Sequence, residues 1–457
     1  MAHQPIGRPP VLEIATGRLP RKRFYLQKRV DESSNIQVSD IPAKPMVIGL
    51  QHAPLGVRST SCLAVWRIRS TRRVAFDRHR GGPSRERSER VKIGMLYSLS
   101  GAQEEMEKSI LDGAVVAVHE INASGGVLGE ELSFAVFDDR SEVASTARGI
   151  DRLCRDESVD VIVGGYTSAS RVSMRPAIHA NRSLLMYPTY FEGEETDSRV
   201  FYCGAAPNQY LADYLGWIAS TLGRRVYIVG SDYIYPRVLG EAIRRLGAHW
   251  DVETVGDWYA PLGETSFAAV LDDIGRKRPS VIICNLVGRD STTAFYTQFH
   301  RAGFTSDSLP IAATATTAID LGHIPPEVSD GHFMVATYFS RIESDVNASY
   351  RQSLIDICGQ RRTHAAQVGA YNAVHALRLA AEQSRSLDPV DLSEALLCVR
   401  FDGSPEGLPF YFRSDHYSAH PSYVGRAADG DYDVIEEFPP RLPEPWWSGS
   451  IPLSASS

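Results

Sequence analysis

Short apolar runs alternate with amphipathic stretches along the chain from residue 91 onward. Residues 91–97 form a mostly apolar run that predicts a buried strand. Apolar side chains then recur at every third or fourth position from Met106 to Ile121, which predicts a helix with one buried face, ended by Gly125 and Gly126. Further strands are expected at 132–137, 159–165, 184–187, 225–230 and 280–285, and further helices at 148–154, 210–222, 237–246 and 293–302.

This alternation of strands and helices indicates an α/β protein with a parallel sheet that is doubly wound by helices. The continuous apolar run at 159–165 is typical of a strand that is buried on both faces of such a sheet. About 350 residues of this pattern exceed what one hydrophobic core supports. We therefore expect two Rossmann-like lobes with a cleft between them, and a site at the carboxyl ends of the strands.

The first 90 residues differ from the rest in net charge and in hydrophobic pattern. They contain 18 Lys and Arg against 7 Asp and Glu, a net charge of +11, whereas the remaining residues carry −18. They show no sustained hydrophobic period and end in an arginine-rich stretch, a composition typical of a chain that buries no core. We expect residues 1–90 to be a disordered leader or the product of a start placed too far upstream. The alternative is an arm that binds nucleic acid.

The same segment contains no recognisable secretory signal. Its apolar runs at 46–50 and 62–66 are each about five residues long, shorter than the apolar stretch of a signal peptide. As written, the chain is expected in the cytoplasm, and in the periplasm if its start is misplaced. No window approaches the roughly 18 consecutive apolar residues of a membrane-spanning helix, so no transmembrane segment is expected.

Motifs of enzymatic chemistry are missing from the sequence. It contains no G-x-S-x-G, no glycine-rich phosphate turn followed by Lys and no H-E-x-x-H, and its six cysteines show no C-x-x-C spacing. His416 and His420 lack a third ligand and are expected to be solvated loop histidines. Asp138 and Asp139 are expected to cap a helix. We therefore expect no catalytic residue, no metal and no cofactor.

Hydroxyl and aromatic residues follow three of the predicted strands. They form the segments 166–168 (YTS), 187–190 (YPTY) and 231–237 (SDYIYPR). Strand ends converge on the crevice of an open α/β sheet, where tyrosines supply flat walls and hydroxyls both donate and accept hydrogen bonds. Such a lining suits a neutral planar solute with N–H donors and a carbonyl acceptor, such as an amide or urea. The alternative is that these tyrosines only extend from the core to the surface.

A series of motifs, several of them in these segments, resembles one protein family. The motifs are, in order, 97–101 (YSLSG), 120–129 (EINASGGVLG), 165–171 (GYTSASR), 187–193 (YPTYFEG), 204–209 (GAAPNQ), 230–237 (GSDYIYPR) and 261–263 (PLG). From residue 91 to about 447 the chain resembles the type I periplasmic-binding-protein family. The resemblance is to the branch that contains the amide sensor of an aliphatic amidase operon and the urea-binding component of an ABC transporter. The proline-rich segment 441–445 (RLPEP) is similar to the terminal segment of that family.

The resemblance implies two lobes that are joined by three crossovers and close on a solute by a hinge. It places 91–209 and 341–402 in lobe one, 210–340 and 403–440 in lobe two, and 441–457 in a proline-rich C-terminal tail. The ligand-binding residues that it implies are Tyr166, Ser168, Tyr187, Thr189, Tyr233 and Tyr235.

The resemblance also implies a function and partners. It indicates a solute-binding protein that holds a short aliphatic amide or urea without chemical turnover. The partner is then either an ABC permease or an antitermination regulator protein, and no nucleic acid is expected for the folded body. Two alternatives belong to other classes: an enzyme that hydrolyses the amide, and a nucleic-acid binder that uses the arginine-rich leader.

Overall fold

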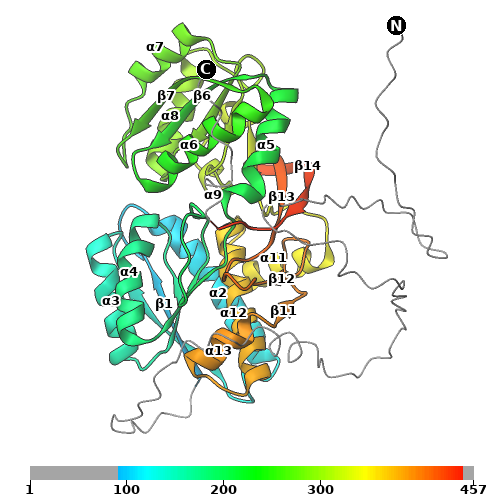
Figure 1. Ribbon diagram of the computed structural model, residues 1–457. Helices are drawn as coiled ribbons and strands as arrows, with labels where there is room; N and C mark the ends of the chain where they lie inside the picture. Colours follow the sequence, from blue (N-terminus) through cyan, green and yellow to red (C-terminus); the bar gives the residue numbers. More distant parts are fainter. Residues whose placement is uncertain (1–90, 446–457) are drawn as a thin grey trace, which may run out of the picture. The chain divides into compact units, whose positions relative to one another are not determined.

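The computed structural model describes residues 91–445 of the 457-residue chain. The predictions for residues 1–90 and for the end of the C-terminal tail lie outside this range. The described chain folds around two main sheets, each with helices on both faces (Figure 1).

The first sheet has the strand order β2-β1-β3-β4-β5 and is entirely parallel. Its strands are β1 (Val91–Tyr97), β2 (Leu132–Asp138), β3 (Val161–Gly164), β4 (Leu184–Tyr187) and β5 (Val200–Tyr202). The associated helices are α2 (Glu104–Ala123), α3 (Val143–Arg155), α4 (Ser168–Asn181), α11 (Asp345–Cys358), α12 (Ala365–Ser384) and α13 (Pro389–Leu396).

Alternate side chains of these strands point to opposite faces, as the two-residue period of a strand requires. Met95 and Val163 pack beneath α2 and α12, which lie side by side. Leu96 and Ile162 pack on the other face, beneath α3 and α4. Both faces of the central strands are therefore buried, which explains why β3 and β4 contain no charged or polar side chain other than Tyr187.

The second sheet has the order β14-β13-β10-β9-β8-β6-β7. Its strands are β6 (Arg225–Ser231), β7 (Glu253–Ala260), β8 (Val281–Asn285), β9 (Ile311–Ala313), β10 (Phe333–Ala336), β13 (His420–Ala428) and β14 (Asp431–Arg441). Helices α5 (Pro207–Thr221) and α6 (Ile234–Gly247) cover one face, and α7 (Ala268–Lys277) and α8 (Arg289–Arg301) cover the other. The short elements are η2 (Ala248–Trp250), α9 (Ala318–Leu321), α10 (Pro326–Ser329), and the strand pair β11 (Arg400–Phe401) and β12 (Phe410–Tyr411).

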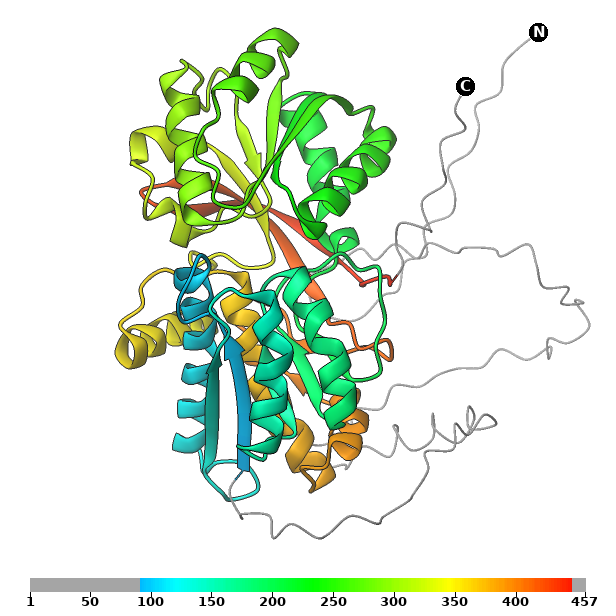
Figure 2. The same ribbon diagram turned by 90° about the vertical axis from the view of Figure 1, so that its left-hand side faces the viewer.

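The second sheet differs from the parallel sheet that the sequence predicts. Strands β13 and β14 join its edge antiparallel, with β13 pairing to β10 and β14 to β13. A two-residue turn at Asp429 and Gly430, both with positive φ, connects β13 to β14, so no helix is needed between the two strands. In Figure 2, β13 and β14 are the orange to red ribbons that extend from this sheet towards the other.

The chain passes from one sheet to the other after β5, after β10 and again before β13. This agrees with an α/β protein of two doubly wound lobes. We call the part built on the first sheet lobe one and the part built on the second sheet lobe two; the residue bounds given for them above stay a prediction.

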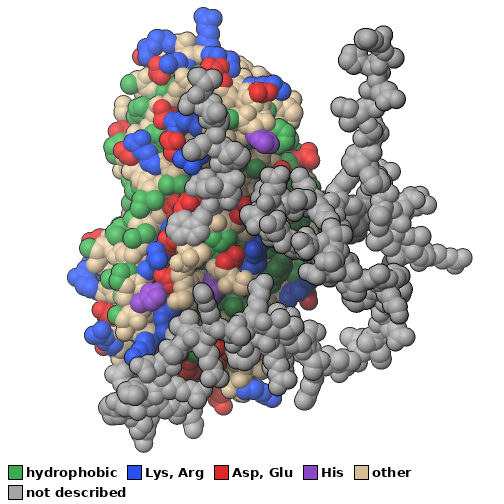
Figure 3. Space-filling model, in the orientation of Figure 1, with side chains coloured by type: hydrophobic (Ala, Val, Ile, Leu, Met, Phe, Trp, Pro, Cys, Tyr) green, Lys and Arg blue, Asp and Glu red, His purple; other side chains and the backbone are tan. Residues whose placement is uncertain are grey.

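The surface of the described residues carries both signs of charge. In Figure 3, Lys and Arg side chains are interspersed with Asp and Glu on the visible coloured face rather than gathered in one basic patch. Among residues 91–445, no helix combines the length and the apolar character that crossing a membrane requires.

Candidate functional site

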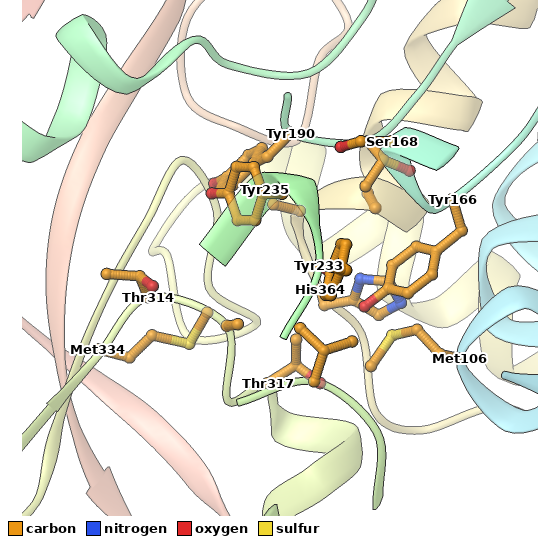
Figure 4. A pocket seen from close by; sticks show the side chains of 15 residues that line it. Met106, Tyr166, Ser168, Tyr190, Tyr233, Tyr235, Thr314, Thr317, Met334 and His364 are labelled. Atoms are coloured by element: carbon orange, nitrogen blue, oxygen red, sulfur yellow. The ribbon is translucent and has the colours of Figure 1, made fainter. Parts of the chain in front are cut away.

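A cavity lies where the carboxyl ends of the strands of the two lobes face each other (Figure 4). It contains about 600 Å³ of empty space, part of which is open to solvent. Lobe one lines it with Met106, Tyr166, Ser168, Thr189, Tyr190, His364, Ala365 and Ala366, and lobe two with Tyr233, Tyr235, Val287, Thr314, Ala315, Thr317 and Met334.

The turn after β3 brings Tyr166 and Ser168 to this cavity. Gly165 has a φ of +84°, and a Cβ atom there would lie 2.4 Å from Cε of Met174, so the turn requires glycine. Thr167 then caps α4 by accepting a hydrogen bond from the backbone N–H of Ser170, and Ser168 begins the helix. The tight turn and the cap together fix the two side chains at the sheet edge.

A buried ion pair outside the cavity lining positions the Ser168 side chain. The Ser168 hydroxyl donates to the Glu192 carboxylate. The same carboxylate is paired with the Arg171 guanidinium at 2.5 Å, and Arg171 Nε also donates to Glu195 at 2.9 Å. The Arg171 side chain is 2% exposed and its guanidinium lies over the Tyr187 ring. Ser168 is therefore positioned by charges that do not themselves line the cavity.

The structure places Tyr187 outside the cavity, against the expectation for a binding residue. Its side chain is fully buried, and its hydroxyl donates to the backbone carbonyl of Tyr166 at 2.6 Å. Thr189 does line the cavity, and its hydroxyl donates to the carbonyl of Gly165 at 3.2 Å. Tyr187 thus supports the turn that carries Tyr166, because its ring packs in the core beneath α3 and α4.

Tyr190 lines the cavity although the sequence did not single it out within its cluster. Its hydroxyl accepts from the backbone N–H of Thr337 at 2.7 Å and lies 3.2 Å from the Thr337 hydroxyl. Thr337 directly follows β10, where the chain leaves lobe two. Tyr190 therefore links the cavity wall to a crossover between the lobes.

Lobe two contributes Tyr233 and Tyr235 from the start of α6. Tyr233 is the N-cap residue, with extended backbone, and Tyr235 lies in the first turn. The Tyr235 hydroxyl is 2.6 Å from that of Tyr210 in the core, so it is already paired. The Tyr166 and Tyr233 hydroxyls, by contrast, have no hydrogen-bond partner among residues 91–445, which leaves both available to a ligand.

Further lining residues have no distinctive sequence pattern. Met106 and Met334 are single methionines, and Thr314 and Thr317 follow a three-residue strand that the sequence did not predict. His364 lies at the N-cap of α12, more than 170 residues after β4 in the chain. Only their convergence in the folded chain marks them.

The lining is electrically neutral within the part of the chain that the structure describes. No Lys, Arg, Asp or Glu side chain is among the lining residues. Burial raises the pKa of Tyr166, Tyr190, Tyr233 and Tyr235 above the ordinary value, so these phenols stay protonated. Burial lowers the pKa of His364 to about 3, so its imidazole is uncharged at neutral pH.

Two expectations for titratable residues outside the cavity are wrong. Asp138 and Asp139 do not cap a helix: α3 begins after Glu142, without a side-chain cap, and both carboxylates instead bind loop groups near Ser98. His420 is 1% exposed and lies 3.0 Å from Glu406, so it is not a solvated histidine. His420 is the first residue of β13, a mostly buried strand that the sequence did not predict.

His416 is half-buried and stacks on Phe201. Burial lowers its pKa. Residues 91–445 contain no group of three or more His, Cys, Asp or Glu side chains that could hold a metal ion.

Comparisons with known proteins agree with this architecture. Residues 91–451 match a family described as the periplasmic binding protein domain. The Leu/Ile/Val-binding protein BraC3 of Rhizobium johnstonii is 26% identical over 199 residues, 42% of this chain and 53% of that protein. Leu/Ile/Val-binding protein homolog 3 of Brucella melitensis is 25% identical over 181 residues, 36% of this chain and 48% of that protein. The chain thus spans about half the length of the curated relatives it matches.

Solved structures show the same fold at lower identity. A solute-binding protein of an ABC transporter from R. palustris, in complex with benzoate, has a TM-score of 0.70 and 18% identity, and the match covers 78% of this chain and 98% of that one. The branched-chain amino acid binding protein LivJ of Streptococcus pneumoniae, in complex with isoleucine, has a TM-score of 0.69 and 18% identity, covering 77% and 99%. Because the family match extends over most of the sequence, from residue 91 to residue 451, this chain belongs to the periplasmic binding protein domain family.

Proposed function

We propose that the protein binds a short neutral amide or urea between its two lobes and releases it unchanged. The observation that carries this proposal is the cavity itself, which has unpaired phenol hydroxyls but no charged side chain among its described lining residues. Tyr166, Ser168, Thr189, Tyr233 and Tyr235 all line it, and we assign them to ligand binding. Tyr187 is assigned a supporting role, because it lies behind Tyr166.

The polar and apolar parts of the lining fit such a solute. The Tyr166 and Tyr233 hydroxyls can donate to a carbonyl oxygen, and one comes from each lobe. Met106 and Met334 offer flexible apolar surface to a short alkyl chain. Because both lobes contribute groups to the same solute, binding favours the arrangement in which the lobes close.

A charged solute fits this lining less well. The relatives are Leu/Ile/Val-binding proteins, and the solved structures include isoleucine and benzoate complexes. An amino acid would bring an ammonium and a carboxylate into a cavity with no described counter-charge on its lining, which costs several kcal/mol unless each is paired. The neutral lining therefore favours an amide or urea over these solutes.

We assign the protein to solute uptake together with an ABC permease, in line with the descriptions of the similar structures. A sensor that controls an antitermination regulator is the second possibility, and it uses the same closing cavity. Genes for a permease and an ATPase beside this gene would support transport. Genes for an amidase and an RNA-binding regulator would support sensing.

Calorimetric titration tests the choice of solute. The purified protein is titrated with acetamide, butyramide and urea, and in parallel with leucine, isoleucine and benzoate. We expect saturable binding for at least one of the neutral compounds and none for the charged ones. Binding of leucine or benzoate without binding of any amide or urea would overturn the proposal.

The same samples separate binding from hydrolysis. An amide-hydrolysing enzyme would release ammonia from acetamide during the titration, whereas a binding protein returns the amide intact. Steady ammonia release that scales with protein concentration would replace the binding proposal with an enzymatic one. The nucleic-acid alternative rests on residues 1–90, which lie outside the described chain.

A further inference from the structure

His364 borders the cavity at the point where α12 begins. It lines the cavity with Tyr166 and Tyr233, and all three side chains are labelled in Figure 4. As the N-cap residue of α12 it has extended backbone, yet its side chain makes no capping hydrogen bond. The imidazole is therefore free of the role that a polar N-cap side chain usually performs.

Ser109 on α2 determines which imidazole nitrogen carries the proton. The Ser109 hydroxyl donates its single proton to the backbone carbonyl of Met106 at 2.6 Å. The same oxygen lies 2.7 Å from His364 Nε2, so it can only accept there, and Nε2 must carry the hydrogen. Ser109 is 1% exposed, which shields this chain of hydrogen bonds from water.

The other nitrogen, Nδ1, is then an unprotonated acceptor. Burial holds the imidazole neutral at ordinary pH, so Nδ1 does not become a donor. No residue within 91–445 hydrogen-bonds to it. The Ser168 and Thr189 hydroxyls give their protons to Glu192 and Gly165, so towards a solute they too can only accept. Nδ1 differs from them because it makes no other hydrogen bond within the described chain.

We infer that His364 Nδ1 accepts a hydrogen bond from an N–H group of the bound solute and makes an N–H donor a condition of tight binding. This inference rests on the proposed function and deepens it. The carbonyl oxygen of an amide or urea meets the phenols, and its N–H meets the imidazole. Solutes of the same shape without an N–H leave Nδ1 buried and unpaired, so they are rejected.

The test compares acetamide with N,N-dimethylacetamide, which keeps the carbonyl and lacks the N–H. We expect the wild-type protein to bind acetamide about 10- to 100-fold more tightly than the dimethyl compound. His364→Asn keeps an acceptor oxygen near the Nδ1 position and should retain most of this preference. His364→Leu removes the acceptor and should reduce the preference to within about threefold.

A merely structural role for His364 would give a different result. In that case His364→Leu would weaken the binding of acetamide and of N,N-dimethylacetamide equally, and the ratio of their Kd values would stay at the wild-type value. That unchanged ratio would overturn the inference. Thermal unfolding of each variant shows whether the fold is retained. If His364→Leu does not fold, the same ratio of Kd values is measured in His364→Gln. Glutamine places its amide beyond the Nδ1 position, so this variant should also lose the preference for acetamide.

The tautomer is measurable without any ligand. Nitrogen-15 NMR of the imidazole should show a protonated Nε2 and a bare Nδ1 in the wild-type protein, and a mixture of tautomers in Ser109→Ala. A protonated Nδ1 in the wild-type protein would overturn the inference whatever the solute is. Absence of any amide or urea binding, with the expected tautomer present, would instead reject the proposed function alone.

Discussion

Hydrogen-bond partners separate the cavity tyrosines into two kinds. Tyr190 and Tyr235 are paired within the protein, to Thr337 and Tyr210. Tyr166 and Tyr233 have no such partner in the described chain, so their hydroxyls are the ones that a solute can use. Residue type alone does not make this distinction, because all four are tyrosines at or near strand ends.

Replacing Tyr233 with Phe should therefore weaken binding of the solute. The change removes one hydroxyl and leaves its partner atom on the buried ligand unpaired, at a cost of about 1–3 kcal/mol, or roughly 5- to 150-fold in Kd. Calorimetry with acetamide or butyramide measures the change. The matched control is Tyr411→Phe on β12, which is not a lining residue and should bind as the wild type does. Unchanged affinity in the Tyr233 variant would remove that residue from the site.

A buried cluster ties the loops after β1 and β2 together. Ser98 Oγ lies 2.9 Å from Glu107 Oε1 and 2.6 Å from Asp139 Oδ1, and it accepts from the Ser141 N–H at 3.0 Å. A hydroxyl has one proton to donate, so it can satisfy only one of the two carboxylates. A protonated Glu107 completes the cluster by donating to Ser98. Burial, reinforced by the charge of Asp139, raises the pKa of Glu107 to about 8.

Glu107 should accordingly make the protein less stable as the pH rises. The folded state favours the neutral carboxyl, so this contribution is fully present below the unfolded pKa near 4.5 and is lost as the pH rises through about 8. Within that window the free energy of unfolding should fall by up to about 1.4 kcal/mol per pH unit. Urea denaturation at pH 5 and pH 8 measures it. In Glu107→Gln, whose amide can donate at any pH, the fall should be much smaller.

An equal pH dependence in the wild type and in Glu107→Gln would contradict this interpretation. A suitable control is Glu130→Gln, since Glu130 lies on the exposed turn after α2 and should leave the pH dependence as it is.

Contacts between the two lobes include one exposed ionic bridge. Glu105 on α2 of lobe one lies 3.2 Å from Arg289 at the start of α8 and 2.7 Å from His323, both in lobe two. Met106, the next residue of α2, lines the cavity, so this bridge lies close to the proposed site. It joins the lobes only in the arrangement that brings these helices together, and so it favours closure.

Removing this bridge with Glu105→Gln should weaken solute binding slightly. Exposed ion pairs contribute about 0–1 kcal/mol, so we expect an increase in Kd of up to about fivefold, and less at high salt. Calorimetry at low and high salt measures both effects. Glu104→Gln is the matched control, because Glu104 pairs with Lys108 on its own helix rather than across the lobes. Equal effects of the two changes would show that the bridge does not assist closure.

Much of the architecture follows from local pattern. Strand β1 and helix α2 were predicted within a few residues, because their apolar periods of two and of three to four are repeated without interruption. The short strands β5 and β9, of three residues each, were missed, since so few residues show no period. The antiparallel β13 and β14 were missed as well, because nothing in their sequence distinguishes edge pairing from parallel pairing.

The candidate site divides in the same way. Tyr166, Ser168, Thr189, Tyr233 and Tyr235 directly follow strands, and the topology of an α/β sheet brings strand ends together, so their convergence was predictable. Tyr187 was placed in the site by the same reasoning and lies beneath it. A shift of one residue along a strand reverses the direction of a side chain, and sequence spacing does not resolve that shift.

The order of apolar and polar residues was sufficient to specify an α/β chain with two sheets and hydroxyl-rich strand ends, since these depend on neighbours within about twenty residues. Which hydroxyls are free, which nitrogen of His364 carries a proton and which carboxyl is buried beside Ser98 depend on residues up to 255 positions apart. Those properties arise from contacts that form only when the chain has folded, because hydrogen-bond partners and burial are assigned in space rather than along the sequence.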